Sequence, residues 1–245
     1  MTDVVGLEIE AFDDIAGPRL ARGPATIAEP LPLRGDMRPA LHDAIDGMRA
    51  DLGRMTDLVV DSLRLCARAI RGEPDPAATV VAGDLAVNEL HRRVRQSVLH
   101  VLTTQAPLAR DLRRVVAALL VDEELERMGD HCVSIAKQCS HLGPAPASQR
   151  EALARMAELA VAQVRAMEAA VEARDVHAAR AVASRDDAVD GVYHSIIDGL
   201  LESEGGNAAP TVVLIAHHLE RIGDRVTNVV EHLVFAVDGG FVELG

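Results

Sequence analysis

Aromatic residues are almost absent from this chain of 245 residues. It contains no tryptophan, one tyrosine and three phenylalanines, although 49% of its residues are hydrophobic. A core of that composition must be built from alanine, leucine, valine and isoleucine, and few runs are rich in strand-forming residues. Because good helix formers recur along most of the sequence, we expect an all-α fold.

Basic runs, zinc-type cysteine pairs and membrane-length apolar runs are also missing. The formal net charge is −13 and the arginines are scattered, which argues against nucleic-acid binding. Cys66, Cys132 and Cys139 form no pair with zinc-ligand spacing, as suits a reducing cytosol. Residues 1–36 lack the basic start and apolar centre of a signal peptide. We therefore expect a cytoplasmic protein.

Residues 1–36 differ from the rest in composition. Pro18, Pro24, Pro30 and Pro32 fall within this segment, together with several glycines, and both residue types oppose helix formation. We expect a flexible N-terminal extension, and Met37 is an alternative start of the chain.

From residue 37 onward, apolar residues recur with a helical period, and Gly/Pro-rich stretches divide the sequence. We expect Thr103 and Thr104 to cap the third helix and Asp175 to cap the fifth. Short loops then favour two tandem antiparallel three-helix bundles, residues 37–142 and 148–238, followed by a tail, 239–245. The six expected helices are 38–71, 77–103, one from near Pro107 to residue 141, 148–173, 175–202 and 210–237.

The phrase LERMGD, which begins at Leu125, returns as LERIGD at Leu219. Each copy places a glutamate four residues before an aspartate. Projected at about 100° per residue, these acids fall opposite the apolar stripe of their helix. We expect both pairs to line the outer face of the bundles. The two pairs, here called the first and second acidic motifs, are Glu126/Asp130 and Glu220/Asp224.

Further polar residues share the same outer stripes. If each second helix packs beside its third helix, two acidic grooves form on the surface. Like charges at this spacing destabilise a helix by roughly 0.2–0.5 kcal/mol per pair, and a bound cation would reverse that effect. The neighbouring candidates are Asp122, Asp84, Asn88, Asp186, Asp190 and His217.

Oxygen ligands of this kind suit Mg, Ca or Mn, and His217 extends the choice to Fe, Zn or Ni. Acids on an exposed helix face usually form only a solvated surface. Repetition of the phrase in both halves of the chain is what favours a metal site. The other histidines near these helices, including His91 and His131, receive no role.

The residues that carry the repeat resemble the PhoU family of regulators associated with phosphate transport. The resemblance rests on LERMGDHCVSIAK from Leu125, HHLERIGDRVTNVVEH from His217 and QAPLARDLR from Gln105, and it spans about residues 37–238. Members are tandem three-helix bundles, the architecture that the periodicity indicates independently.

The resemblance implies a function as well. PhoU-like proteins are cytoplasmic, non-enzymatic negative regulators of phosphate uptake and of the phosphate-starvation response. They are linked to the ATPase subunit of the phosphate ABC transporter and to a sensor histidine kinase, and a homodimer is expected. Members can bind metal clusters through the acidic motifs, which here are Glu126/Asp130 and Glu220/Asp224.

The two motifs differ in their surroundings. Ser134 stands where the second copy has Asn228, and Lys137 corresponds to Glu231. Because a lysine repels a cation or takes its place, we expect the second motif to bind metal more strongly.

Two alternatives remain open. A ferritin-like di-metal enzyme would need carboxylates and an E-x-x-H motif inside a four-helix core, whereas only the reversed order His217-x-x-Glu220 occurs. A helical adaptor whose acids bind no metal is also compatible with the sequence.

Overall fold

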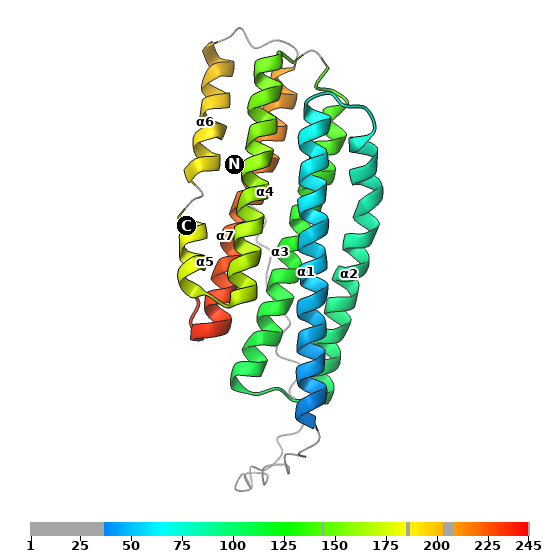
Figure 1. Ribbon diagram of the computed structural model, residues 1–245, viewed down its shortest axis with the longest axis vertical. Helices are drawn as coiled ribbons and strands as arrows, with labels where there is room; N and C mark the ends of the chain where they lie inside the picture. Colours follow the sequence, from blue (N-terminus) through cyan, green and yellow to red (C-terminus); the bar gives the residue numbers. More distant parts are fainter. Residues whose placement is uncertain (1–36, 144, 185–186, 203–207, 245) are drawn as a thin grey trace, which may run out of the picture. The chain divides into compact units, whose positions relative to one another are not determined.

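The regular secondary structure is entirely helical in the parts of the chain that the structure describes. The computed structural model describes residues 37–143, 145–184, 187–202 and 208–244, and the predicted extension 1–36 lies outside them. This confirms the expected all-α class. The helices, shown in Figure 1, are α1 (Met37–Ile70), α2 (Pro76–Thr104), α3 (Ala109–Cys139), α4 (Ala147–Ala173), α5 (Val176–Ala183), α6 (Asp187–Glu202) and α7 (Ala209–Asp238).

The fifth predicted helix is divided in the structure. Asp175 accepts hydrogen bonds from the backbone N–H groups of His177 and Ala178, so the predicted cap is confirmed. However, α5 ends at Ala183, and Ser184 donates its hydroxyl hydrogen to the carbonyl of Ala181. The single helix predicted over 175–202 is therefore wrong, because serine competes locally for the backbone groups that a continuous helix would use.

The two threonines before α3 act on the preceding helix. Thr103 and Thr104 donate to the carbonyls of Leu99 and His100, at 2.8 and 2.7 Å. Each hydroxyl thus bonds back to a carbonyl four residues earlier within α2. The N-cap of α3 is Leu108, which offers no side-chain acceptor, so the predicted role of the threonines as caps of α3 is wrong.

Each half of the chain contributes one three-helix repeat. Helices α1, α2 and α3 pack together, and α4 and α7 pack with α5 and α6, which together occupy the place of the middle helix (Figure 1). The repeats meet where α1 contacts α4 and α3 contacts α7, and the buried apolar side chains form one continuous core. Ala154, Ala157 and Ala160 of α4 are fully buried, so small side chains allow close helix approach.

Arg150 of α4 joins the ends of three helices. Its guanidinium donates to the carbonyl of Ile70 at the end of α1, at 3.2 Å. It also donates to the carbonyls of Leu142 and Gly143, just after α3, at 2.9 Å each. Helix C-termini leave carbonyls without partners, and a cation is favoured there by the helix dipole. One side chain therefore fixes how the second repeat begins relative to the first.

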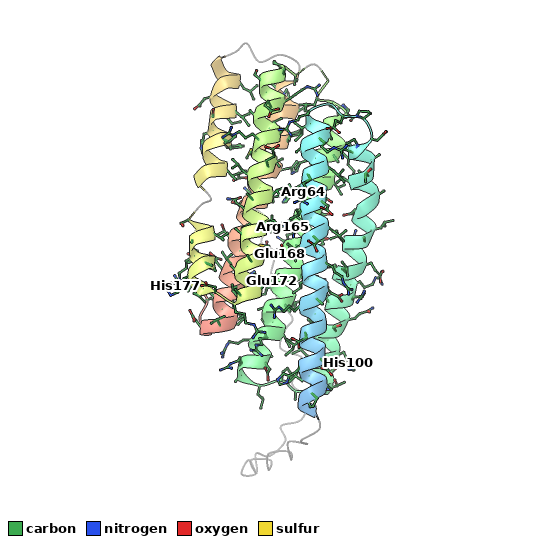
Figure 2. All side chains as sticks on the ribbon, viewed as in Figure 1. Arg64, His100, Arg165, Glu168, Glu172 and His177 are labelled. Atoms are coloured by element: carbon green, nitrogen blue, oxygen red, sulfur yellow. The ribbon has the colours of Figure 1, made fainter. Side chains whose placement is uncertain are left out.

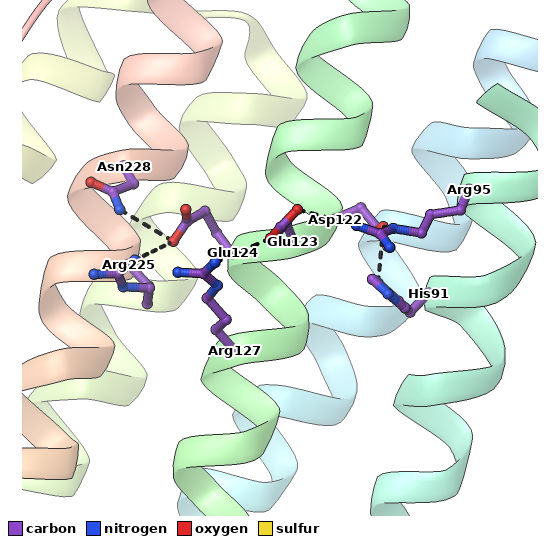
Figure 3. Close-up of polar contacts among 8 residues, drawn as sticks. All are labelled: His91, Arg95, Asp122, Glu123, Glu124, Arg127, Arg225 and Asn228. Atoms are coloured by element: carbon purple, nitrogen blue, oxygen red, sulfur yellow. Dashed lines mark hydrogen bonds and ion pairs between the residues drawn. The ribbon is translucent and has the colours of Figure 1, made fainter. Parts of the chain in front are cut away.

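The contact between α3 and α7 is the most extensive in the molecule. The two helices run antiparallel, and Glu124 of α3 is buried between them. Its Oε2 accepts from Arg225 at 3.1 Å and from Asn228 at 3.2 Å, both on α7 (Figure 3). A carboxylate removed from water needs such charged and polar partners, so this cluster fixes the register of the two helices.

No helix in the described residues is long and apolar enough to cross a membrane.

We predict that Glu124→Ala lowers the free energy of unfolding by about 2–3 kcal/mol, because Arg225 then stays buried without its carboxylate. Urea denaturation of the full chain measures this. Glu123→Ala is the matched control, since Glu123 is 42% exposed in its ion pairs with Arg95 and Arg127 and should cost less than about 1 kcal/mol. Equal losses in the two variants would contradict the assignment.

Candidate functional site

The first acidic motif lies on α3 at the boundary between solvent and protein. Glu126 is half-buried, whereas Asp130, one turn later, is exposed. Burial raises the pKa of Glu126, and the negative charge of Asp130 raises it further. The two carboxylates therefore disfavour each other's charge, which a cation between them would relieve.

Asp122 does not share that outer position. Its side chain is fully buried between α3 and α2, which corrects the prediction that it lies on the exposed stripe. His91 Nδ1 lies 2.9 Å from Asp122 Oδ2, and Arg95 Nε lies 3.7 Å from the same oxygen (Figure 3). The helical projection treats a helix as a cylinder in water, but α2 covers this edge of α3.

The buried carboxyl of Asp122 has altered chemistry. Its pKa is raised to about 6, mainly by burial and to a smaller extent by Glu126, while His91 and Arg95 oppose the rise. Its Oδ1 has no hydrogen-bond partner among the described residues. A buried oxygen without a donor calls for a further partner, such as water or an ion. Sequence reasoning gave His91 no role, and only knowledge of the α2–α3 register could have linked it to Asp122.

Helix α2, which carries the predicted stripe of Asp84 and Asn88, packs on α3 at Gly129, within the first motif. A Cβ atom added at Gly129 would lie 3.4 Å from a methyl group of Val87, so the missing side chain allows the two helices to approach. Val87 and Gly129 directly precede Asn88 and Asp130 in the sequence. Within the stripe, Asn88 donates to Asp84 at 2.8 Å. The groove expected between the second and third helices stays a prediction.

The second acidic motif is already occupied by a cation of the protein itself. Arg221 lies between the two acids, 3.0 Å from Asp224 and 3.5 Å from Glu220. His217 Nδ1 is 3.5 Å from Glu220. The side chains predicted to complete this site, those of Asp186 and Asp190 on the fifth helix, lie outside the described residues.

The repeated phrase contains one arginine in each copy, and the two arginines pair with different acids. Arg127 occupies the same place in the first copy but pairs with Glu123 at 3.1 Å, away from the motif. The position that matches Glu123 is His217, which offers no carboxylate, and Arg221 turns to Asp224 instead. Lys137 led us to expect stronger metal binding at the second motif. The ion pairs argue for the opposite order, because Arg221 competes with a metal ion for the second motif.

His131 and His218, which sequence reasoning did not select, meet where α3 packs on α7. Their Nδ1 atoms are 3.2 Å apart. The pKa of His131 is lowered to about 4, mainly by burial and also by the charges of His218 and Arg225. The pKa of His218 is also lowered, mainly by burial. Both rings therefore favour the neutral form, in which one nitrogen donates and the other accepts.

Taken together, the described side chains supply the donor types of a metal site but not a closed coordination shell. No group of three or more histidine, cysteine, aspartate or glutamate side chains among them is arranged to hold an ion. Carboxylate and amide oxygens beside an unpartnered buried oxygen suit a hard cation such as Mg²⁺, Ca²⁺ or Mn²⁺. The second motif differs in that Arg221 lies between its two carboxylates.

Comparison with known proteins now identifies the family. The model of the PhoU domain matches residues 52–139 and again residues 153–233, one match for each three-helix repeat. The chain belongs to the PhoU family. The resemblance seen in the repeated phrase is thereby confirmed.

Curated relatives of this PhoU chain extend over most of its length. One from Caulobacter vibrioides, named phosphate-specific transport system accessory protein PhoU homolog, is 32% identical over 200 residues, which cover 78% of this chain and 87% of the relative. A relative from Mycobacterium tuberculosis, PhoU homolog 2, is 27% identical over 212 residues, covering 84% of this chain and all of that protein.

Solved structures share the fold. A crystal structure of the phosphate transport system regulatory protein PhoU from Streptococcus pneumoniae matches with a TM-score of 0.74 at 24% identity, covering 84% of this chain and 99% of that one. PhoU from Pseudomonas aeruginosa gives 0.64 at 21% identity, covering 83% and 98%. Both confirm the tandem helical architecture.

We predict that the stability of this PhoU protein falls as the pH drops from 7 towards 4, in part because of His131. Its folded pKa of about 4 lies below the unfolded value of about 6.5. Its contribution is therefore complete above pH 6.5 and is lost as the pH approaches 4. Urea denaturation at pH 7 and at pH 4 measures the free energy of unfolding. Its decrease between the two pH values should be smaller for His131→Gln than for the wild type.

The control for this measurement is His177→Gln, at an exposed position on α5 (Figure 2). It should keep the full drop in stability of the wild type. If His131→Gln also keeps the full drop, the histidine contact is not the origin of the acid sensitivity.

Proposed function

We propose that this chain is a non-enzymatic negative regulator of phosphate uptake and of the phosphate-starvation response. The observation that carries the proposal is the match of both repeats to the PhoU domain, together with relatives named accessory proteins of phosphate-specific transport. The 32% identity to one of them extends across both repeats rather than a single motif. In this role the protein acts by binding other proteins of the phosphate system and not by catalysing a reaction.

The proposed partners are the ATPase subunit of the phosphate ABC transporter and the sensor histidine kinase of the phosphate two-component system. We place the protein in the cytoplasm, as a homodimer that meets the membrane only through these partners. The extended helical faces of the two repeats suit contacts with other proteins, since recognition by a helical surface needs no preformed catalytic pocket.

Deleting the gene tests the regulatory role. We expect phosphate-repressed reporter genes to become active in phosphate-rich medium, because the negative regulator is lost. A plasmid copy of the wild-type chain should restore repression. Normal repression in the deletion strain, or failure of the wild-type copy to restore it, would contradict the proposal.

We further propose that the acidic motifs hold divalent cations in the cytoplasm. At the first motif Glu126 and Asp130 would bind the ion, with Asp122, Asp84 and Asn88 beside them. Three features support this: the raised pKa of Glu126, the unpartnered oxygen of buried Asp122 and the adjoining polar stripe of α2. A bound cation would supply positive charge that removes the repulsion between the carboxylates. At the second motif the candidates are Glu220, Asp224, His217, Asp186 and Asp190.

We predict that the first motif binds Mn²⁺ more tightly than the second. Glu126→Gln/Asp130→Asn should weaken the tighter calorimetric binding step by at least about tenfold. Glu220→Gln/Asp224→Asn should leave that step unchanged. Protein prepared without chelator or affinity metal is used throughout, and the absence of Mn²⁺ binding to the wild type would instead support an adaptor without metal.

Arginine variants test whether Arg221 competes with the metal ion for the carboxylates of the second motif. Arg221→Met should strengthen binding at the second motif, because the guanidinium no longer pairs with Asp224. Arg127→Met is the matched control at the same place in the repeated phrase, where the arginine pairs with Glu123. Equal effects of the two variants would show that Arg221 does not compete with the cation.

A further inference from the structure

A crevice opens where the two repeats meet, at a distance from both acidic motifs. It has a volume of about 370 Å³ and is lined by α1, α3, α4 and α7. This volume lies at the lower end of the range of about 300–1,000 Å³ found for small-molecule pockets. Its walls are largely aliphatic, and among the lining residues are Ile45, Leu52, Val121, Met167, Val229 and Leu233.

Four arginines lie around this crevice, although the protein as a whole is strongly acidic. Two of them have protein partners. Arg49 donates to the carbonyl of Glu172 at 2.7 Å, and Arg114 lies 3.4 Å from Asp111. Arg110 and Arg174 form no hydrogen bond or ion pair through their side chains with any described residue. Two guanidinium groups are therefore available to a ligand.

These guanidinium groups also influence one another. Burial lowers the pKa of Arg174, and the charges of Arg114 and Arg49 lower it further, while Asp46 opposes the shift. Arg174 ends α4 with a backbone φ of 53°, a left-handed conformation that directs the chain away from the helix. Like charges held near one another favour an anion, because it relieves their repulsion.

Two glutamates and one histidine also line the crevice. Glu168 and Glu172 lie one turn apart on the part of α4 beside α1 (Figure 2). Glu168 is paired with Arg165 at 2.6 Å, so its charge is largely offset. The remaining lining group is His232 of α7, whose pKa is lowered, mainly by burial. The four arginines thus outnumber the two glutamates among the lining residues.

We propose that the crevice binds an anionic amphiphile, with an aliphatic chain between the helices and a carboxylate or phosphate head held by the arginines. The aliphatic walls would bury the hydrocarbon chain of the ligand and so remove its apolar surface from water. Guanidinium groups suit the head because they pair with planar or tetrahedral oxyanions through two parallel hydrogen bonds. This site is separate from the acidic motifs and does not depend on the proposed regulatory function.

Calorimetry on the full chain tests the ligand class. The probes share one chain length and differ in the head: dodecanoate, dodecyl phosphate and dodecyltrimethylammonium, each below its micelle concentration. We expect the two anions to bind with one site per chain and the cation not to bind. Inorganic phosphate should neither bind measurably nor displace dodecanoate. Binding of the cation with equal affinity, or of free phosphate alone, would overturn the proposal.

Two variants test where the hydrocarbon chain and the anionic head of the ligand bind. Gly53 lines the crevice, and a Cβ added there meets no atom within 4 Å, so Gly53→Leu should fill the space and abolish dodecanoate binding. The double variant Arg110→Met/Arg174→Met should weaken binding by at least about tenfold, through loss of charge-assisted hydrogen bonds. Neither change removes the partner of a described carboxylate.

Gly47→Leu is the matched control, since Gly47 is an exposed glycine of the same helix, also with open space at its Cβ, and does not line the crevice. It should bind dodecanoate as the wild type does. Circular dichroism and urea denaturation check that each variant is folded. Binding that survives Gly53→Leu in a folded protein would place the ligand elsewhere and overturn the proposal.

Discussion

The antiparallel packing of α3 on α7 is the constraint on which the rest of this structure depends. These helices carry the two copies of the repeated phrase, so their contact relates one copy to the other. Leu125 corresponds to Leu219, Glu124 to His218, and Arg225 to His131. The buried Glu124–Arg225 ion pair and the His131–His218 contact are therefore equivalent contacts of the two repeats. The Glu124–Arg225 contact is charged, whereas the His131–His218 contact is neutral. The two ends of the α3–α7 interface therefore differ in charge.

The two acidic motifs also differ in the charged residues around them. At the first motif, Glu123 engages Arg127 and leaves the motif carboxylates without an arginine between them. At the second, a histidine stands in the place of Glu123, and Arg221 pairs with Asp224. Duplication thus preserved the acids while changing the cations around them. The second motif is stabilised by charge from its own helix.

The arginine-lined crevice has a different origin, because it exists only where one repeat meets the other. Helices α1 and α3 supply one wall and α4 and α7 supply the other. Arg174 is placed there by the end of α4, and Arg110 and Arg114 by the first turns of α3. The crevice draws on both repeats, since the first supplies three of its arginines and the second supplies Arg174. The interface between repeats therefore offers a binding surface that the acidic motifs do not.

The sequence by itself determined the helical class, the tandem repeat and the acidic pairs, because periodicity and repetition are local properties of a chain. It also placed Asp175 as a cap correctly, since capping involves only adjacent residues. Only the tertiary structure decided that Asp122 is buried against His91 and that Glu124 joins α3 to α7. Those outcomes depend on which neighbouring helix covers each edge of α3, and a helical projection contains no information about the neighbours of the helix.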